Sequence, residues 1–141
     1  MAYRFNRYDT DKFTDGEWVE IEGGQFKVAK YGNAEHLEVA EEINKRNKRK
    51  YQSGDVPVQV MIEDSAEELA RGVLKDWKDI EGEDEAGKPC PVPFSVENAK
   101  ILLMNDEPLR NRIKRESQDL SRFERERIGE QAKKRKTTSG S

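Results

Sequence analysis

The sequence predicts a mainly α fold: a small helical domain of about four helices with an N-terminal β-hairpin and a flexible basic C-terminal tail. Three observations support this fold class. Apolar residues recur at the three- and four-residue spacing of helices in several segments after residue 33. Two short alternating runs flank Gly23 and Gly24, which is typical of a hairpin. The last residues are basic and lack apolar periodicity, which is typical of a tail outside the core.

Length and composition favour one domain with extensions at both ends. The chain has 141 residues, of which 33% are hydrophobic and 39% are charged, so we expect a small core and a large exposed surface. We expect an N-terminal arm over 1–16, a single helical domain over 17–128 and a disordered basic tail over 129–141. No apolar run of about 18 residues is present to span a membrane. The single cysteine, Cys90, is typical of a reducing cytosol.

The arm over 1–16 leaves two interpretations open. Its aromatic residues follow neither a helical nor a strand period, so the arm is either disordered or folded over the core. The following residues, 17–31, predict the β-hairpin, because apolar and polar residues alternate on both sides of the glycine pair. An isolated hairpin is barely stable in water, so its apolar side must pack on helices or on another subunit. The aromatic residues of the arm are Tyr3, Phe5, Tyr8 and Phe13.

The next segment, 33–51, predicts a helix. Asn33 suits the N-cap, an apolar stripe follows, and Gly54 suits a stop. Five cations crowd the end of this helix, where they either form a patch for nucleic acid or complement the exposed helix carbonyls; we favour the second interpretation. His36 has no second histidine or cysteine pair nearby in the sequence, so we expect no metal site. The five cations are Lys45, Arg46, Lys48, Arg49 and Lys50.

The segment 57–80 contains the main conflict in the sequence. Its beginning, 56–62, is rich in β-branched residues, as in a strand. A helical stripe nevertheless runs through the segment and ends in Trp77 and Ile80. We expect a helix over 57–80, with strand and helix both open at 56–64 and helix favoured there. The acidic loop that follows, 81–90, lacks the ligand spacing of an EF-hand, so we expect a solvated loop.

Two further helices are predicted after a connector that three prolines keep extended. Ser95 suits an N-cap, and apolar residues at helical spacing predict a helix over 95–105. The pattern breaks at Asp106, and Pro108 suits the first turn of the next helix, over 108–128. Together they predict a helix–turn–helix hairpin. The three prolines are Pro89, Pro91 and Pro93.

Charge is distributed unevenly along the chain. From Arg110 onward, eleven lysines and arginines stand against five acidic residues, a balance of +6, whereas the preceding residues carry −9. A basic end on an acidic body is typical of nucleic-acid binding. The acidic residues are interleaved with the arginines, however, so we favour a solvated helix and do not expect a nucleic-acid partner.

The sequence contains no recognisable catalytic arrangement. A Ser–His or Cys–His pair would need His36 as its base, and no neighbouring residue is placed to orient that side chain. A P-loop, a glycine-rich dinucleotide turn and a zinc quartet are also missing from the sequence. We therefore expect no enzymatic activity, no cofactor and no metal.

A group of short motifs surrounds the proline connector. It comprises Trp77, an acidic loop with glycine, Val92-Pro93-Phe94-Ser95, Glu97-Asn98-Ala99, Leu102-Leu103 and Pro108-Leu109. Together these motifs resemble the tail assembly chaperones of long-tailed bacteriophages, in which a tryptophan-ended helix, a loop with glycine and proline and a P-[FY]-S-x-E-x-A-x-x-L-L helix start recur. The resemblance covers roughly 64–123, and the first fifty residues match only loosely. The acidic loop is longer here and a Cys-Pro pair precedes Val92, so the loop geometry of that family does not carry over.

The resemblance implies a function and partners. Such chaperones are small cytoplasmic proteins that bind the tape measure protein, or tail tube subunits, before the tube polymerises, and they are absent from the mature virion. We therefore expect these two proteins as partners in the host cell cytoplasm, with self-association as a further option. The candidate partner-binding residues form an apolar seam, which alternatively is simply the intramolecular core. The seam residues are Trp77, Phe94, Leu102, Leu103, Leu109 and Ile113.

Two other functions stay open: a minor virion structural protein, and a small nucleic-acid-binding protein that uses the basic residues. The resemblance also implies two product lengths, because such chaperones often have a longer form made by −1 ribosomal frameshifting. Ala132-Lys133-Lys134 is a triplet that the slippery heptamer A-AAA-AAG can encode. We therefore expect a minor, longer product that changes frame after Lys134.

Overall fold

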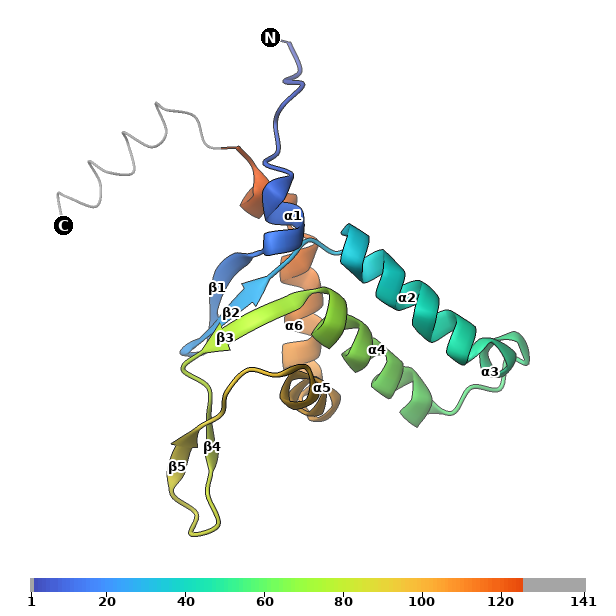
Figure 1. The fold of residues 1–141 in the computed structure, drawn as a ribbon, viewed down its shortest axis with the longest axis vertical. Helices are drawn as coiled ribbons and strands as arrows, with labels where there is room; N and C mark the ends of the chain where they lie inside the picture. The colour runs from blue at the N-terminus through green and yellow to red at the C-terminus, as the bar shows by residue number, and fades with distance from the viewer. Residues whose placement is uncertain (1, 126–141) are drawn as a thin grey trace, which may run out of the picture.

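The computed structural model describes residues 2–125, which form a mixed α/β fold and not the mainly α fold that the sequence predicts (Figure 1). These residues contain six α-helices, a three-stranded antiparallel sheet in the order β1-β2-β3 and a two-stranded hairpin, β4-β5. Within them, no helix combines the length and apolarity needed to cross a membrane. The elements are α1 (Asp11–Asp15), β1 (Glu17–Ile21), β2 (Gly24–Val28), α2 (Ala34–Arg46), α3 (Lys48–Gln52), α4 (Val58–Gly72), β3 (Leu74–Lys78), β4 (Glu81–Glu83), β5 (Pro89–Pro91), α5 (Val96–Asn105), α6 (Glu107–Ser117) and a 3-10 turn (Leu120–Phe123).

The β1–β2 hairpin forms where the sequence predicts it. Its register places Ile21 opposite Gly24, so Glu22 and Gly23 alone form the turn. Both turn residues have positive φ, 49° and 88°, which is the type I′ geometry that two-residue hairpins favour. Gly24 lies in the strand instead of the turn, and a Cβ there would come within 2.8 Å of the Ile80 side chain. The second glycine of the pair therefore serves close packing, not the turn.

The third strand shows that the predicted helix over 57–80 is wrong after residue 72. Helix α4 ends at Gly72, and β3 pairs antiparallel with β2. The register shifts along this pair, as in a β-bulge, so that Leu74 and Trp77 both face the core although they are three residues apart. In the sequence this three-residue spacing imitates a helical stripe.

The caps predicted at Asn33 and Ser95 are confirmed, and the structure adds a third cap at Asp106, where the sequence predicts only a break in the helical pattern. Asn33, Ser95 and Asp106 each accept a hydrogen bond from a backbone N–H in the first turn of α2, α5 and α6 respectively. The open question at 56–64 is answered by α4, which begins at Val58. The buried apolar residues of α4 lie in its later turns, at Ala66, Leu69 and Ala70, whereas Val58 and Met61 in its first turns are more than half exposed.

Two predicted helices end earlier than expected. The helix over 33–51 is divided at Asn47 into α2 and α3, and the side-chain amide of Asn47 donates to both carboxylate oxygens of Asp64 at 2.9 and 2.7 Å. The helix over 108–128 is α-helical only to Ser117, whose carbonyl accepts a long-range hydrogen bond from the backbone of Tyr31. The remainder of that prediction beyond residue 125, and the predicted tail over 129–141, lie outside the described residues.

Most of the N-terminal arm folds over the core, which is the second of the two interpretations left open. The backbone N–H of Asp9 donates to the carbonyl of Phe123, and that of Arg125 donates to the carbonyl of Arg7, both at 2.8 Å. The ring of Phe13 packs edge-on against Phe123 with 5.8 Å between the centroids. The first and last described segments are therefore paired side by side (Figure 1). The exposed aromatic residues of the arm are Tyr3 and Phe5.

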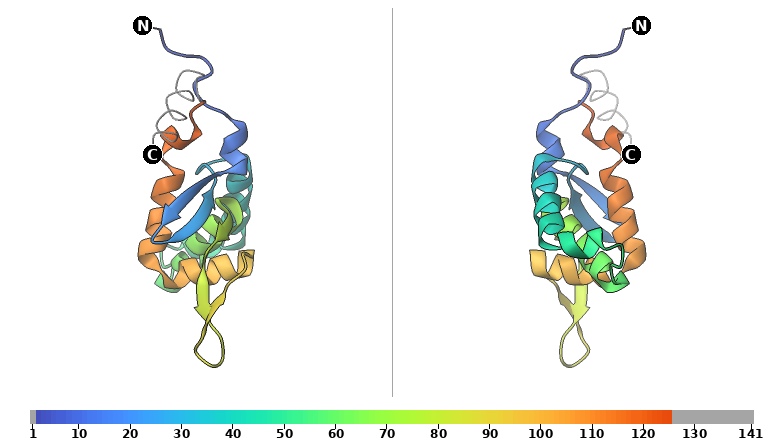
Figure 2. Two further views of the ribbon diagram at one scale, coloured as in Figure 1. Left: turned by 90° about the vertical axis from the view of Figure 1, so that its left-hand side faces the viewer. Right: turned by 90° about the vertical axis from the view of Figure 1, so that its right-hand side faces the viewer.

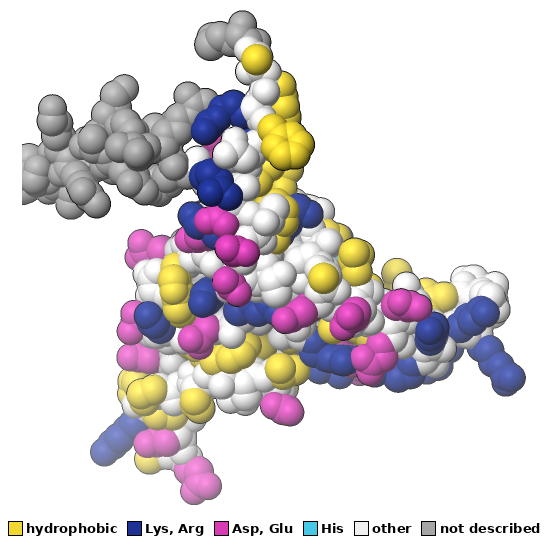
Figure 3. All heavy atoms as spheres, turned by 45° about the horizontal axis from the view of Figure 1, so that its top comes forward, with side chains coloured by type: hydrophobic (Ala, Val, Ile, Leu, Met, Phe, Trp, Pro, Cys, Tyr) yellow, Lys and Arg dark blue, Asp and Glu magenta, His cyan; other side chains and the backbone are white. Residues whose placement is uncertain are grey.

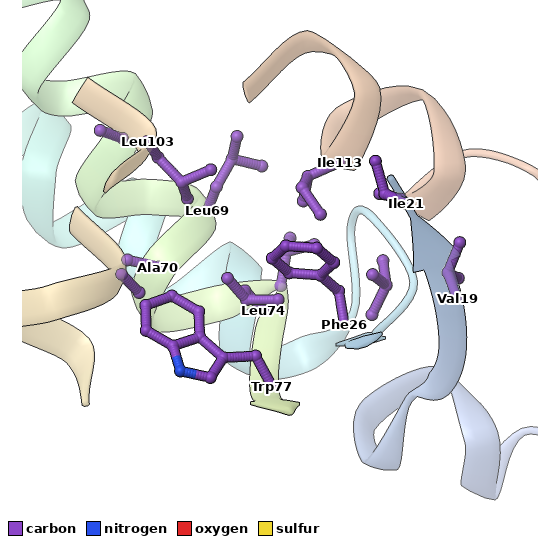
Figure 4. Packing of buried hydrophobic residues seen from close by; sticks show 13 residues of the cluster. Val19, Ile21, Phe26, Leu69, Ala70, Leu74, Trp77, Leu103 and Ile113 are labelled. Atoms are coloured by element: carbon purple, nitrogen blue, oxygen red, sulfur yellow. The ribbon is translucent and has the colours of Figure 1, made fainter. Parts of the chain in front are cut away.

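The core lies between the sheet and the helices that follow it. Helix α4 contacts α2, α5, α6 and β3, and α6 also contacts β2. Figure 4 shows the result: Phe26 from β2 and Trp77 from β3 face Leu69 of α4, Leu103 of α5 and Ile113 of α6. The β1–β2 hairpin, α4, β3, α5 and α6 thus all contribute to one cluster.

The predicted acidic loop over 81–90 is a short hairpin, β4–β5, which projects from the body of the molecule (Figure 1). Its turn is held by Asp84, whose Oδ1 accepts from the backbone N–H groups of Ala86 and Lys88, each at 2.9 Å. The loop is therefore ordered by local hydrogen bonds, although its carboxylates remain exposed as expected.

Candidate partner-binding cleft

The structure divides the predicted seam into core residues and residues that keep some exposed surface. Trp77, Leu103 and Ile113 are at most 5% exposed and belong to the core cluster. The other three are half-buried and pack against that cluster. Only this second group retains side-chain surface that a partner can touch. Its members are Phe94, Leu102 and Leu109.

Trp77 links the sheet to the connector before α5. Its indole Nε1–H donates to the carbonyl of Val92 at 2.8 Å, and its ring meets Phe94 edge-on at a centroid distance of 5.3 Å. Ser95 then caps α5. The residues that carry the chaperone resemblance therefore form one packed unit, although the tryptophan lies in a strand and does not end a helix.

Leu102 and Leu109 line a cleft of about 420 Å³. The cleft lies between the β1–β2 turn, the connection from β3 to β4 and the corner between α5 and α6. Figure 2 (left) shows the β1–β2 turn beside α6, with α5 below them. The remaining apolar lining residues are Ile21, Phe26, Ile80 and Pro108.

Charged side chains flank the apolar part of this cleft. On the α6 side stand Arg112 and Arg115, separated by one helical turn. On the sheet side stand Glu22, Asp79 and Glu81, all of them exposed. The cleft therefore has a cationic side and an anionic side with apolar surface between them.

Two residues on the anionic side adopt a backbone conformation that is rare for non-glycine residues. Glu22 has φ of 49° and Asp79 has φ of 60°, and within the described chain no other non-glycine residue has positive φ. This left-handed conformation costs about 1 kcal/mol for a residue with a Cβ. Such outliers gather at functional sites. Their location at one cleft favours a role for these two side chains beyond the turns themselves.

The basic residues of α2 and α3 do not form a continuous free patch. Arg46 donates to both carboxylate oxygens of Glu67 at 3.2 and 2.9 Å. Lys45 pairs with Glu41 at 3.1 Å, one helical turn earlier. Two of the five predicted cations are thus neutralised within the domain. The other three, which are exposed, are Lys48, Arg49 and Lys50.

Glu67 is a buried carboxylate at the centre of an ion cluster whose cations are partly exposed. Besides Arg46, it accepts hydrogen bonds from Arg71 at 2.9 Å and from Lys100 at 3.3 Å. Burial alone would raise the pKa of Glu67, but the bonds from Arg46 and Arg71 outweigh it and lower the pKa to about 2. The cluster joins α2, α4 and α5 and so holds the helices behind the cleft in place.

His36 is buried and hydrogen-bonded through both ring nitrogens. The backbone N–H of Gly32 donates to Nδ1 at 2.9 Å, and Nε2 lies 2.6 Å from Oε1 of Glu68. Because Nδ1 accepts, we assign the ring proton to Nε2, which donates to Glu68 and lowers the pKa of that carboxyl. In residues 2–125, no group of three or more His, Cys, Asp or Glu side chains is arranged to hold a metal ion.

Sequence analysis identified two of the apolar residues that line the cleft, Leu102 and Leu109, but missed the other apolar residues and both charged flanks. A glutamate next to glycine in a two-residue hairpin turn is one signal, because that position normally favours asparagine. The spacing of Arg112 and Arg115 on a predicted helix is another, because it places both on one face. Neither signal shows that the two charged groups lie across the same cleft, since that depends on how the sheet packs on α6.

Comparison with known proteins identifies the family of this chain. A family model described as YdaY prophage protein matches residues 31–134, which include every seam residue and both arginines of the cleft. Searches among curated proteins and among solved structures find no significant match. The family model covers well over half of the chain. The chain therefore belongs to the YdaY prophage protein family and is of phage origin.

Proposed function

We propose that this prophage protein is a tail assembly chaperone, which binds the tape measure protein or tail tube subunits during tail assembly and leaves before the particle is complete. Two independent facts support the proposal. The chain belongs to a prophage family. The motifs from Trp77 to Leu109 resemble those of tail assembly chaperones.

The observation that carries the proposal is that those motifs pack together as one unit, part of which lines the cleft. Trp77 and Phe94 support the connector from inside, while Leu102 and Leu109 line the cleft. Long helical clients with apolar faces aggregate unless those faces are covered. A cleft with apolar lining residues between charged ones can cover such a face reversibly, and a protein whose residues are 39% charged remains soluble itself; Figure 3 shows charged side chains over much of one face.

Co-purification tests this function. The chain, carrying an affinity tag, is co-expressed with the tape measure protein of the same prophage, and separately with the tail tube protein. Leu109→Glu places a carboxylate on the apolar lining and should abolish recovery of the client. Ile101→Glu introduces the same charge on α5 at a side chain that is 57% exposed and is not part of the cleft, so recovery should be unchanged.

Two results would contradict the proposal. The first is that neither client is recovered with the wild-type chain, and the second is that Leu109→Glu recovers as much client as Ile101→Glu. The main alternative is a minor structural protein of the virion. Mass spectrometry of purified particles distinguishes it from a chaperone, because a structural protein is present in the virion and a chaperone of this kind is not.

A further inference from the structure

The shape of the cleft constrains what can lie in it. Its lining is apolar along Phe26, Ile80, Leu102 and Leu109, and charged residues stand on both sides of that strip. A helix matches this pattern, because it presents an apolar stripe between two polar flanks. An extended segment does not match as well, since its side chains point alternately to the floor and to solvent.

The cationic side has donors to offer a ligand. Arg112 uses its Nε–H for Glu116 at 2.7 Å, and its terminal nitrogens make no bond to a described side chain. Arg115 is exposed, and its side chain likewise makes no hydrogen bond or ion pair within residues 2–125. Asp106 is the one carboxylate on this side that lines the cleft, and it caps α6 by accepting from the N–H of Leu109 at 3.0 Å. Donors therefore dominate along the α6 side.

The anionic side is positioned by the turns of the sheet. Glu22 lies in the β1–β2 turn, while Asp79 and Glu81 lie in and directly after the turn that follows β3. Two of these three carboxylates stand on left-handed backbone, where glycine or asparagine would be more stable. The carboxylates on this side therefore make the turns that carry them less stable than glycine or asparagine would.

We propose that the cleft binds an amphipathic helix of the client whose two polar flanks carry opposite charges. Acidic side chains of that helix pair with Arg112 and Arg115, basic side chains pair with Glu22, Asp79 and Glu81, and the apolar stripe lies on Leu102 and Leu109. This inference rests on the proposed function and defines the class of client segment. Like charges on either flank are repelled, so the cleft selects among apolar helices by their charge pattern.

Three synthetic peptides test the charge pattern. All have the same helical length and the same apolar stripe of leucine and phenylalanine. The first carries glutamate on one flank and lysine on the other, the second carries glutamate on both flanks, and the third carries lysine on both. Fluorescence anisotropy at about 0.1 M salt should show that the wild-type chain binds the first peptide roughly tenfold more tightly than either of the others. The comparison does not depend on the direction in which the helix lies, because reversing it only exchanges the flanks.

Charge reversal of one side should change which peptide is preferred. With Arg112→Gln and Arg115→Glu the cleft is anionic on both sides, so the peptide with lysine on both flanks should bind best. With Glu22→Lys and Asp79→Lys it is mainly cationic, so the peptide with glutamate on both flanks should bind best. Lys48→Glu with Arg49→Gln is the matched control for the first change, because it alters net charge equally at exposed residues outside the cleft and should keep the wild-type preference.

Folding of each variant is checked by its thermal transition. If the double arginine variant does not fold, Arg115→Glu alone carries the test, because that side chain has no partner in residues 2–125. Equal affinity for the three peptides, no binding of any of them, or an unchanged preference in the reversed variants would overturn the inference. If Leu109→Glu abolishes recovery of the client while the charge-reversed variants recover it as well as wild type, the proposed function is still supported. Only the inference about charge pattern is then contradicted.

Discussion

Trp77 illustrates how one residue determines the arrangement of several elements. Its side chain is 5% exposed, packs between Phe26 and Phe94, and donates its indole N–H to Val92. It therefore joins the sheet to the connector that leads into α5. Burial of this residue follows from its size and apolarity, whichever secondary structure it adopts.

Replacing Trp77 with alanine should lower the free energy of unfolding by about 3–5 kcal/mol, because it leaves a large cavity and an unpaired carbonyl at Val92. This loss is enough to unfold a small domain. Thermal and urea denaturation measure it. Trp18→Ala is the matched control. Because the Trp18 side chain is 37% exposed, its removal should lower the free energy of unfolding far less. Equal melting temperatures for wild type and Trp77→Ala would show that the tryptophan is not a core residue.

Glu22→Asn should make the domain more stable by up to about 1 kcal/mol, because asparagine followed by glycine is the preferred type I′ pair. The melting temperature should rise by a few degrees. Glu20→Asn removes the same charge from an exposed strand position and should not stabilise. If Glu22→Asn is neutral or destabilising, the left-handed backbone at this residue is not strained.

At the scale of elements, α4 is the helix on which the others are assembled. Its buried Glu67 binds Arg46 of α2 and Lys100 of α5, and its Gly72 approaches α2 so closely that a Cβ would come within 2.7 Å of the Cα of His36. These contacts place α5, and with it one side of the cleft, relative to the rest of the domain.

The Glu67 cluster should make stability depend on pH in the acid range. The pKa of Glu67 is lowered from its ordinary value near 4.5 to about 2, so its contribution is complete above pH 4.5 and is lost as the pH falls toward 2. That contribution is on the order of 1–3 kcal/mol, since Arg46 is half-exposed and solvent screens the pair. The difference in unfolding free energy between wild type and Glu67→Gln should shrink as the pH is lowered through this range. A constant difference would contradict the assignment.

The basic residues of α2 and α3 should not bind nucleic acid. Arg46 forms a hydrogen-bonded ion pair with Glu67, and Lys45 forms an ion pair with Glu41. The three remaining cations are exposed and lie together in α3. Mobility-shift assays with random duplex and single-stranded DNA at physiological salt should show no complex below about 10 µM protein. A shift at nanomolar protein that is lost in Lys48→Glu with Arg49→Glu would favour a nucleic-acid-binding function.

At the scale of the whole molecule, the local features of the fold could be predicted and the non-local ones could not. The β1–β2 hairpin and the caps at Asn33 and Ser95 depend on neighbouring residues, and the structure confirms them, although the turn consists of Glu22 and Gly23 and not of the glycine pair. Strand β3 was missed because Val73, Trp77 and Ile80 continue the helical spacing of the stripe before them. That strand is defined by pairing with β2, which is about fifty residues away in the sequence.

In the candidate cleft, too, the local features could be predicted and the non-local ones could not. Leu102 and Leu109 were found from their helical pattern and motif, whereas Glu22 and Arg115 come together only through tertiary packing. The arm was ambiguous because Phe13 gains its partner, Phe123, from the far end of the described chain. The frameshift expected after Lys134 lies outside the described residues and stays a prediction.

The solubility of the tape measure protein tests the central claim most directly. The tape measure protein of the same prophage is expressed alone, with the wild-type chain, with Leu109→Glu and with Ile101→Glu, and its soluble fraction is measured after centrifugation. The proposed function predicts that it is largely soluble with the wild type and with Ile101→Glu, and largely aggregated alone or with Leu109→Glu. A tape measure protein that aggregates equally with and without the wild-type chain would contradict the chaperone function.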